Sequence, residues 1–513
     1  MAARIHRWCD GLTEAVLYFL VVFSPWAFGT TQAWSIAVVC WVSYAMGFLL
    51  LTKHWLRWRS GYQQARWGQV SDPERNSSRR NRSAADRWFA RVLAALTVFI
   101  LLFCLVSALN PRAQYFHNTR VLRNITCIPW LPHSYDAPAT WLAFWQYLAM
   151  ACVFWSVRDW LLGKTRREQL QEMSAFQPPL STPDKTHSRA SAVSSSVRSS
   201  WYLPDRMRRL LWVLSINGAV LALEGVLQRL DGSNKLLWLI QPRINRAVES
   251  QFGPYAYRSN ASQYLNQVWP LCLALWFALR HQHKKEKRHS SRIGSGPHSV
   301  LMPCAIITAA APLVSTSRGG AIIAITGWFA AMAVLLFAGP RGHRYYQLGL
   351  ILVFLLAGGL GGYLGWDKLE PRLRAMLSGD TSNRDIVYRN ARPMAEDHPW
   401  FGTGPGTFST LYQYYRENPN QDWSVMAHDD WLETRITFGW VGLIGILACL
   451  LLVTSKWLWA GGIPAPWILP TLIWISLGGC LIHAKFDFPF QVLSILLLFV
   501  LICAILSCLA RKE

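Results

Sequence analysis

Apolar residues are grouped in long blocks along the chain, and polar connections separate the blocks. The blocks run for roughly 18 to 24 residues, the length that crosses the hydrocarbon core of a bilayer as an α-helix. A transmembrane β-barrel would show shorter segments in which apolar and polar residues alternate. The pattern therefore predicts an all-α polytopic membrane protein with about twelve transmembrane helices, near residues 12–29, 33–52, 88–109, 139–162, 209–230, 263–280, 299–316, 320–338, 346–365, 437–455, 467–483 and 488–509.

The composition agrees with a membrane protein. Of the 513 residues, 52% are hydrophobic and only 15% are charged, whereas soluble domains carry about 25% charged residues. Nearly all of the 11 cysteines lie inside apolar blocks, and Cys127 is the only one that we place outside the membrane on the non-cytoplasmic side. No disulfide framework is therefore expected.

The formal net charge of +23 invites a nucleic-acid interpretation, but the position of the basic residues favours another one. Lysine and arginine concentrate in the connections 53–87, 163–207 and 281–292, which all fall on the same side of the predicted spans. Cytoplasmic connections of membrane proteins carry such an excess. We therefore place these connections and both termini in the cytoplasm, and we expect no nucleic-acid partner.

The same pattern divides the chain into parts. Residues 68–86 are polar and rich in arginine and serine, and residues 173–202 form a Pro/Ser tract that cannot build a core. We expect a two-helix hairpin at 1–52, a cytoplasmic basic linker at 53–87, and a helix pair at 88–162 with a non-cytoplasmic loop at 110–138. A disordered cytoplasmic linker at 163–207 and a catalytic membrane core at 208–513, with a long loop at 366–436, complete the chain.

The non-cytoplasmic side is also rich in arginine, which is unusual for translocated loops. Long loops cross the membrane regardless of charge, so ordinary solubility is one explanation. The other is an anionic ligand on this side, and we favour it. The arginines in question are Arg112, Arg120, Arg123, Arg243, Arg246, Arg258, Arg318, Arg372, Arg374, Arg384, Arg389 and Arg392.

Two short segments place arginines where they suit a phosphate. Arg318 lies in the turn Ser315–Gly320, whose glycines and hydroxyls permit close approach of a ligand oxygen, although an arginine at a helix end also anchors helices. Arg384 begins a helix-like run that contains Arg389, and guanidinium groups donate paired hydrogen bonds to phosphate. A solvated helix face with ordinary salt bridges is the alternative for this run.

The segment His428–Glu433 is a candidate for a metal cluster or for a catalytic base. His428 and Glu433 are five residues apart and face different ways on a helix, whereas zinc motifs place their ligands at i and i+4. A histidine just before a membrane helix suits a general base better, because its unperturbed pKa lies near neutrality. Asp487, at the corner between the last two spans, is positioned to pair with Lys485, or with an arginine or histidine of the loops.

We expect smaller roles for two further segments. Asn260, with other amides that follow it, enters a membrane helix, where it either caps the helix or bonds to sugar hydroxyls. The turn-rich segment His398–Phe408 lacks the Lys-Ser/Thr of a P-loop, and we interpret it as structural.

Taken together, these segments resemble the superfamily of bacterial O-antigen ligases and polymerases. The matching stretches follow the family's order of motifs, and the resemblance extends over most of residues 130–500. Asp429 stands where the family usually has Asn, and residues 259–262 differ from its Arg-Asn-His. The stretches are WLPHSYDAPATW at 130–141, FGPYAYRSNASQYL at 252–265, TSRGG at 316–320, NRDIVYRNARPMAEDHPWFGTGPGTF at 383–408, HDDWLETRITFGWVGL at 428–443 and FDFPFQV at 486–492.

The resemblance implies a GT-C-like enzyme of the bacterial inner membrane whose active site faces the periplasm. Such an enzyme transfers a glycan from a polyprenyl-pyrophosphate lipid to an acceptor hydroxyl, with inversion, without a metal and without a cofactor. Its partners are the lipid-linked donor, a glycan or glycolipid acceptor and the bilayer.

The candidate residues fit this chemistry. Arg318 and Arg384 would neutralise the pyrophosphate and His428 would act as the base. Arg389, Arg258, Asn260 and Asp487 would bind or orient the substrates.

Two alternatives remain open at this point. A repeat-unit polymerase of the same superfamily would share the arginines and the histidine, and would differ only in its acceptor. A flippase or exporter of lipid-linked glycans would also have many spans and a basic outer lining, but it would need no base at His428.

Overall fold

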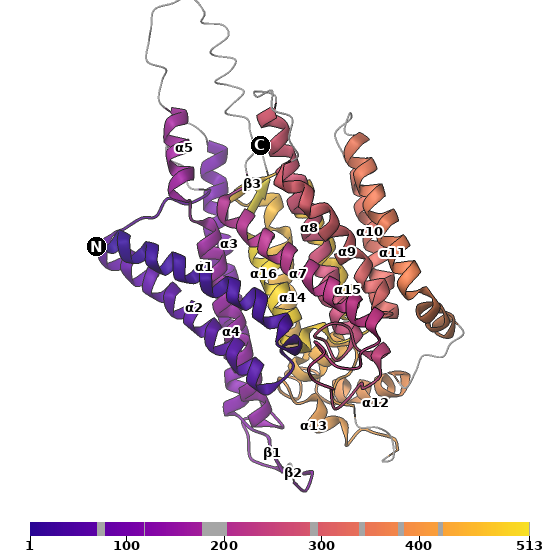
Figure 1. Ribbon diagram of the computed structural model, residues 1–513. Coiled ribbons are helices and arrows are strands. Elements are labelled where there is room, and N and C mark those ends of the chain that lie inside the picture. The colour runs from indigo at the N-terminus through magenta and orange to yellow at the C-terminus, as the bar shows by residue number, and fades with distance from the viewer. Residues whose placement is uncertain are drawn as a thin grey trace, which may run out of the picture.

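The computed structural model is a bundle of long helices with small irregular elements gathered at its two ends (Figure 1). It describes residues 1–68, 77–116, 118–176, 203–287, 296–337, 344–377, 384–418 and 424–511. The N-terminal half contains α1 (Ala2–Trp26), η1 (Phe28–Thr30), α2 (Ala33–Ser60), α3 (Ser77–Leu109), β1 (Ala113–Phe116), β2 (Val121–Asn124), α4 (Ala137–Leu162), α5 (Arg166–Phe176) and α7 (Asp205–Asp231).

The C-terminal half begins with η2 (Val248–Ser250) and the long helix α8 (Arg258–Lys287). The elements that follow are η3 (Pro297–Val300), α9 (Leu301–Val314), α10 (Arg318–Phe337), α11 (Arg344–Leu377), α12 (Arg384–Asp397), α13 (Phe408–Tyr412), α14 (Asp430–Trp459), β3 (Ile463–Ala465), α15 (Ile468–His483), η4 (Pro489–Gln491), α16 (Leu493–Cys508) and β4 (Leu509–Arg511).

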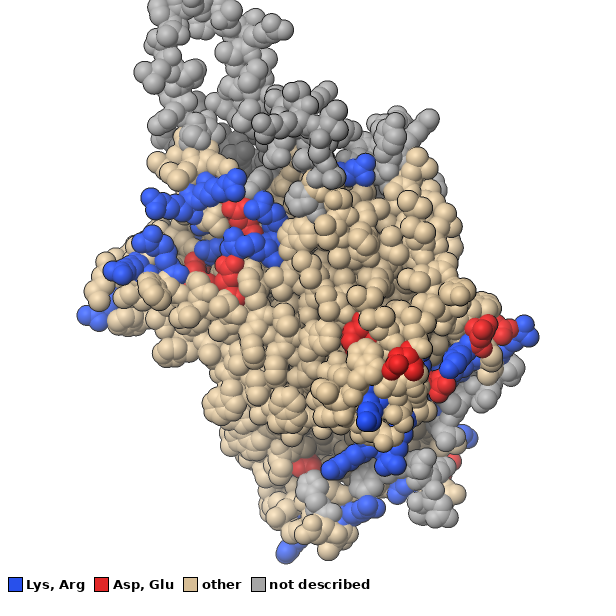
Figure 2. Space-filling view, viewed as in Figure 1, with Lys and Arg blue, Asp and Glu red and all other residues tan. Residues whose placement is uncertain are grey.

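The helices agree with an integral membrane protein. Each of the twelve predicted spans overlaps one of the helices. Five described helices are long and apolar enough to cross a membrane: α2, the part of α3 from Ala84 onward, α4, α7 and α14. Four shorter apolar helices correspond to α9, α10, α15 and α16. The number of membrane crossings therefore stays a prediction. Figure 2 shows a broad belt almost free of charged side chains on the visible face, with charged residues gathered at the two ends.

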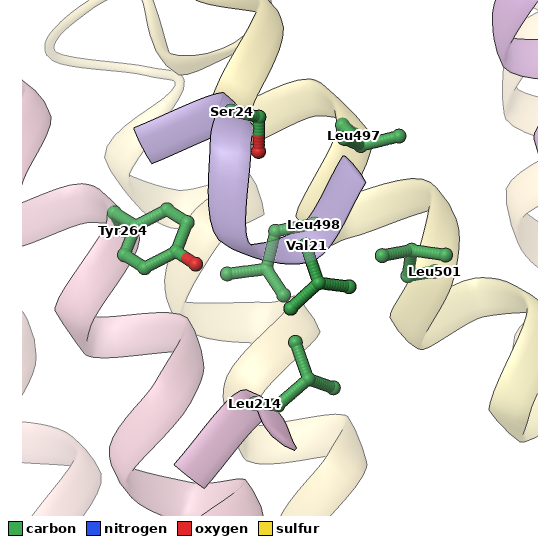
Figure 3. Close-up of a pocket in the computed structure, with 7 residues that line it drawn as sticks. All are labelled: Val21, Ser24, Leu214, Tyr264, Leu497, Leu498 and Leu501. Atoms are coloured by element: carbon green, nitrogen blue, oxygen red, sulfur yellow. The ribbon is translucent and has the colours of Figure 1, made fainter. Parts of the chain in front are cut away.

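Helix α8 lies at the centre of the C-terminal part, where it packs against α7, α9, α10, α15 and α16. Its buried face includes large aromatic side chains, of which Trp269 is 2% exposed. Helices α1, α2 and α4 pack against one another in the N-terminal part, and α4 also packs against α16. A narrow apolar gap remains between α1, α7, α8 and α16; it is lined by Val21, Ser24, Leu214, Tyr264, Leu497, Leu498 and Leu501 (Figure 3). None of the described residues that line this gap is charged, so they offer no cation to a pyrophosphate.

The end that carries the N-terminus and α5 is held by a buried network of charges. The Nζ atom of Lys53 is fully buried and lies 3.1 Å from Asp10 and 2.8 Å from Asp159. Arg206 also pairs with Asp10, and Arg57 pairs with Asp159. Because α1, α2, α4 and α7 each contribute a charge, the network joins four helices at this end of the bundle.

Two predicted boundaries differ in the structure. Residues 166–176 lie inside the linker predicted as disordered, yet they form α5, because Glu168 accepts hydrogen bonds from the backbone N–H and hydroxyl of Thr165 and from the N–H of Asp205. Residues 366–377, the first part of the long loop predicted outside the membrane, are helical, since α11 continues beyond its apolar part. Much of the two polar tracts, residues 69–76 and 177–202, lies outside the described residues.

The opposite end of the bundle carries β1, β2, α12, α13 and the first turn of α14 (Figure 1). Strands β1 and β2 form an antiparallel pair, and a small hydrophobic cluster joins the loop elements through residues such as Met394, Phe408, Tyr412 and Ile436. The Gly-rich segment 402–406 packs here against α14 at Gly439, where the helix is kinked with φ 62°. A Cβ on Gly402 would lie 2.5 Å from the backbone of Thr437, so this segment has a structural role.

Candidate functional site

The site is built around the carboxylate of Asp487, in the corner between α15 and η4. One oxygen of Asp487 lies 3.2 Å from Nδ1 of His428, and the other accepts hydrogen bonds from Ser259 Oγ at 2.5 Å and from the Tyr257 hydroxyl at 3.4 Å. The Asp487 side chain is 3% exposed, whereas the His428 side chain is 27% exposed. The histidine therefore faces outward from a buried acid.

The sequence around His428 fixes this corner in place. The side chain of Asp429 caps α14 by accepting the N–H of Leu432, and it also pairs with Lys485. Asp430 accepts the backbone N–H of Phe490 at 2.7 Å, and its own N–H donates to the carbonyl of Ala484. Two consecutive acids thus join the start of α14 to the chain on either side of Asp487.

His428 itself has an unusual backbone conformation. Its φ is +54°, a region that residues other than glycine seldom occupy. The hydroxyl of Tyr388 donates to the His428 carbonyl at 2.8 Å, and the imidazole packs edge-on against Phe488 with ring centroids 4.8 Å apart. A carboxylate at Nδ1 favours the tautomer with its proton on that nitrogen, so Nε2 keeps a lone pair that can accept a proton.

Arg384 closes the site from α12. Its guanidinium donates to the Phe486 carbonyl at 2.6 Å and to the Tyr257 hydroxyl at 3.0 Å, and it lies 3.9 Å from Asp487. The side chain remains 32% exposed. Arg384 therefore presents a positive charge on the same side of the corner as His428, with part of its surface free for a ligand.

Electrostatics hold the acid of this corner in its charged form. Burial alone would raise the pKa of Asp487, but the hydrogen bond with His428 and the charge of Arg384 outweigh burial and lower the pKa of the carboxyl below its usual range. Burial likewise lowers the pKa of Arg384, but Asp487 and Tyr257 more than offset it and raise the pKa. Asp487 and Arg384 thus form an ionised pair beside the imidazole.

A second positive centre surrounds the Ser315–Gly320 turn. Arg229 donates to the Ser315 carbonyl at 3.0 Å, Arg372 donates weakly to the Thr316 carbonyl at 3.4 Å, and Arg258 donates to the Glu249 carbonyl at 2.5 Å. Arg318, at the start of α10, makes no hydrogen bond or ion pair with the residues that the structure describes. We refer to Arg229, Arg258, Arg318 and Arg372 as the arginine cluster.

The charges of the arginine cluster act on one another. Burial, followed by the charges of Arg372 and Arg318, lowers the pKa of Arg258 to about 10. Burial and the charge of Arg318 also lower the pKa of Arg372, although Glu249 opposes them. Glu249 is the nearby acid, and it is itself paired with Lys368 at 2.8 Å. An anion placed among these guanidinium groups would relieve their repulsion.

The two centres are continuous. Ser317 Oγ lies 3.4 Å from Ser259 Oγ, which in turn donates to Asp487. On the other side of the turn, a Cβ on Gly319 would lie 3.0 Å from Nε2 of the buried His483, so glycine permits close packing there. The start of α8, the turn before α10 and the corner after α15 therefore pack together, and buried contacts connect the corner of His428 to the arginine cluster.

The structure brings together most of the residues singled out from the sequence. His428, Asp487 and Arg384 meet in the corner, and Arg318 and Arg258 meet in the arginine cluster. Asn260 follows Ser259 in α8, is 5% exposed, and its Oδ1 has no hydrogen-bond partner in the part of the chain that the structure describes. Arg389 lies on the exposed side of α12, and no contact with the corner is found among the described residues.

Sequence reasoning missed several side chains that build the site. Tyr257 and Ser259 flank Arg258, but nothing in their neighbourhood indicates that both bond to an acid about 230 positions later in the chain. Arg372 was counted only among the outer arginines. Tyr388 carried a readable signal, because it lies four residues after Arg384 and therefore on the same face of a helix.

Residues 303–447 match the family model described as O-Antigen ligase. This match covers less than a third of the chain, and it supports a relation to the superfamily of O-antigen ligases and polymerases. The matched region contains Arg318, Arg372, Arg384 and His428, and the contacts described above connect it to Tyr257, Ser259 and Asp487 outside the match. No curated protein and no solved structure matches the chain. The matched family indicates activity of the O-antigen ligase or polymerase type at a coarse level.

Proposed function

We propose that this protein transfers a glycan from a polyprenyl-pyrophosphate carrier to an acceptor hydroxyl at the periplasmic face of the bacterial inner membrane. The transfer inverts the anomeric centre and needs no metal. The observation that carries the proposal is the juxtaposition of the His428–Asp487 pair with Arg384 and, through the contact of Ser259 with Ser317, with the arginine cluster.

In this arrangement the glycan is transferred by a single displacement at the anomeric carbon. The acceptor oxygen attacks the anomeric carbon and forms the new C–O bond, while the bond between that carbon and the pyrophosphate oxygen breaks. The proton of the acceptor hydroxyl passes to Nε2 of His428, and Asp487 stabilises the imidazolium that forms. Because attack and departure occur on opposite sides of the carbon, a single displacement inverts its configuration.

The leaving pyrophosphate gains charge as the bond breaks, and cations must stabilise it. Arg384, 3.9 Å from Asp487, is next to the histidine and is proposed to contact the phosphate nearer to the sugar. The arginine cluster is proposed to hold the remaining phosphate, with Arg318 as the principal contact because it has no described partner. Arg258 is proposed as a further contact, and Asn260 and Arg389 are proposed to bind the glycan or the acceptor. With this many guanidinium groups, charge neutralisation is available from side chains alone.

A catalytic base distinguishes the proposed glycosyl transfer from the function of a flippase or exporter. A flippase or exporter needs a basic lining for a pyrophosphate, but unless it is driven by protons it needs no acid–histidine pair beside that lining. The pairing of His428 with Asp487 therefore favours an enzyme. A ligase and a repeat-unit polymerase would use the same residues and differ in their acceptor.

The proposal is tested by reconstituting the purified protein in lipid discs with a polyprenyl-pyrophosphate glycan and candidate acceptors. We expect a glycosylated acceptor, free polyprenyl pyrophosphate in equal amount, an inverted linkage by NMR, and the same rate with a metal chelator present. Growth of the glycan on the lipid carrier itself would identify a polymerase. If the donor is bound and no acceptor of either kind is glycosylated, glycosyl transfer by this protein is refuted.

A further inference from the structure

The connection between α7 and α8 displays apolar and basic side chains together. Leu239 is 73% exposed and Ile244 is 76% exposed, and Trp238 and Ile240 are also exposed. The same connection carries three exposed cations, Lys235, Arg243 and Arg246. It follows directly on α7, one of the helices that can cross a membrane, and it ends where α8 begins. We call residues 235–246 the interfacial loop.

The interfacial loop contains a strained turn that presents these side chains. Leu237 and Trp238 have φ values of 53° and 59°, and hydrogen bonds between Leu236 and Ile240 close the turn. Such turns usually contain Asn or Gly, because the Cβ atom of other residues is crowded in this conformation. Trp238 Nε1 donates to Asp231 at the end of α7. Strain of this kind persists where surrounding contacts hold it, and it concentrates at functional segments.

The base of the loop is fixed to the bundle. Gln251 donates to the carbonyls of Asn234 and Asn245, and Arg229 donates to the carbonyls of Val248 and Gln251. Because the base is held from both sides, the loop cannot simply fold its apolar side chains inward. Arg229 also bonds to the Ser315 carbonyl, so the interfacial loop is attached directly to the turn of the arginine cluster.

We propose that the interfacial loop is a docking surface for anionic phospholipids. Trp238, Leu239, Ile240 and Ile244 enter the boundary between headgroups and acyl chains, and the three cations bind headgroup phosphates. An aromatic ring among exposed aliphatic side chains is typical of segments at membrane interfaces. Basic residues near a membrane surface favour anionic lipids. A protein partner would meet the same apolar side chains, but the loop emerges from the end of a membrane helix, where lipid is the medium already in contact.

The depth of a fluorophore in the bilayer tests whether the apolar side chains of the interfacial loop enter the membrane. An environment-sensitive dye is attached to Leu239→Cys in a Cys127→Ser background, with Glu396→Cys, an exposed site on α12, as the matched control. The background chain without an added cysteine gives the labelling blank. In lipid discs we expect quenching of the dye at 239 by lipids with spin-labelled acyl chains and protection from aqueous iodide, and the reverse at 396. Iodide quenching at 239 equal to that at 396 would overturn the proposal.

The preference of the protein for anionic over zwitterionic lipid tests whether the cations of the interfacial loop bind headgroup phosphates. The protein is placed in discs that contain spin-labelled phosphatidylglycerol or phosphatidylcholine, and the ratio of their association constants is measured by electron spin resonance. The variant Arg243→Gln with Arg246→Gln should lower that ratio by about five-fold for each arginine, whereas Arg392→Gln, an exposed arginine of α12, should leave it unchanged. An unchanged ratio in the double variant would show that these arginines do not hold anionic lipid.

Discussion

The hydroxyl of Tyr388 donates a hydrogen bond of 2.8 Å to the main-chain carbonyl of His428. One turn earlier on the same helix, Arg384 donates to the carbonyl of Phe486, next to Asp487. Helix α12 thus holds both halves of the site, the backbone that aims the proposed base and the corner that carries its acid. The positive φ of His428 makes the first of these contacts important, because a strained backbone relaxes when its support is removed.

Replacing Tyr388 with Phe should therefore lower kcat while leaving the affinity for the donor unchanged. The phenyl ring keeps the packing and loses one hydrogen bond, which is worth about 1 kcal/mol, or roughly a five-fold rate. Turnover and donor binding are measured on the same preparation. The control is Tyr414→Phe, which removes an exposed hydroxyl that bonds to Arg120 on the hairpin of β1 and β2. Equal rates for the two variants would contradict a positioning role for Tyr388.

Substitution of Arg384 or Arg318 by Lys tests whether charge alone is enough for the pyrophosphate. A lysine keeps the positive charge but cannot donate two parallel hydrogen bonds to a phosphate. We expect each Lys variant to lose most of its turnover, and the Ala variants to be worse. Transfer rates with a fixed donor and acceptor provide the measurement. Wild-type rates for both Arg384→Lys and Arg384→Ala would show that this arginine does not contact the leaving group.

The sequence predicted the helices and supplied candidate site residues, but it did not predict the geometry that joins them. His428 and Arg384 could be singled out because each residue type suits one step of glycosyl transfer, and Asp487 because an acid at a helix corner needs a partner. Tyr257 and Ser259 could not, because their bonds to Asp487 depend on how α8 and α15 pack, and no local pattern contains that information.

Helix boundaries show the same limit. Apolar blocks mark where a helix crosses the bilayer, but α11 continues to Leu377 through Asp367 and Lys368, because a helix does not end where its residues become polar.

Arg389 was grouped with Arg384 on the strength of residue type. One position beyond Tyr388 turns the side chain by about 100°, and the structure places it on the exposed side. Its role in substrate binding stays a prediction.

The buried charge network at the other end of the bundle should be important for stability. Lys53→Met removes the cation between Asp10 and Asp159. Breaking a buried ion pair costs about 3 to 5 kcal/mol, and we expect the lower end because Arg206 and Arg57 still face the two acids. Thermal unfolding in detergent measures the effect. Lys368→Met, which breaks the exposed pair with Glu249, should cost no more than about 1 kcal/mol. Similar melting temperatures for both variants would contradict this assignment.

Asp487 should make stability depend on pH in the acidic range. Its pKa is lower in the folded protein than in the unfolded chain, so its ion pairing stabilises the fold above the unfolded value of about 3.9. The contribution is lost as the pH falls through the folded pKa. The difference in melting temperature between the wild type and Asp487→Asn should shrink as the pH falls below about 4. A difference that persists unchanged in the acidic range would mean that Asp487 is not held ionised by the contacts described.

The central claim is that His428 acts as the base, and it is tested most directly by measuring donor binding and product formation in His428→Ala. General-base catalysis contributes about 10²- to 10⁴-fold, so transfer should fall by that factor. The protein should still fold and still bind the polyprenyl-pyrophosphate glycan through its arginines. His428→Gln, which keeps hydrogen bonding but takes up no proton, should be nearly as slow. Wild-type transfer by His428→Ala would contradict the mechanism, and a loss of donor binding in step with transfer would make His428 a binding residue instead of a base.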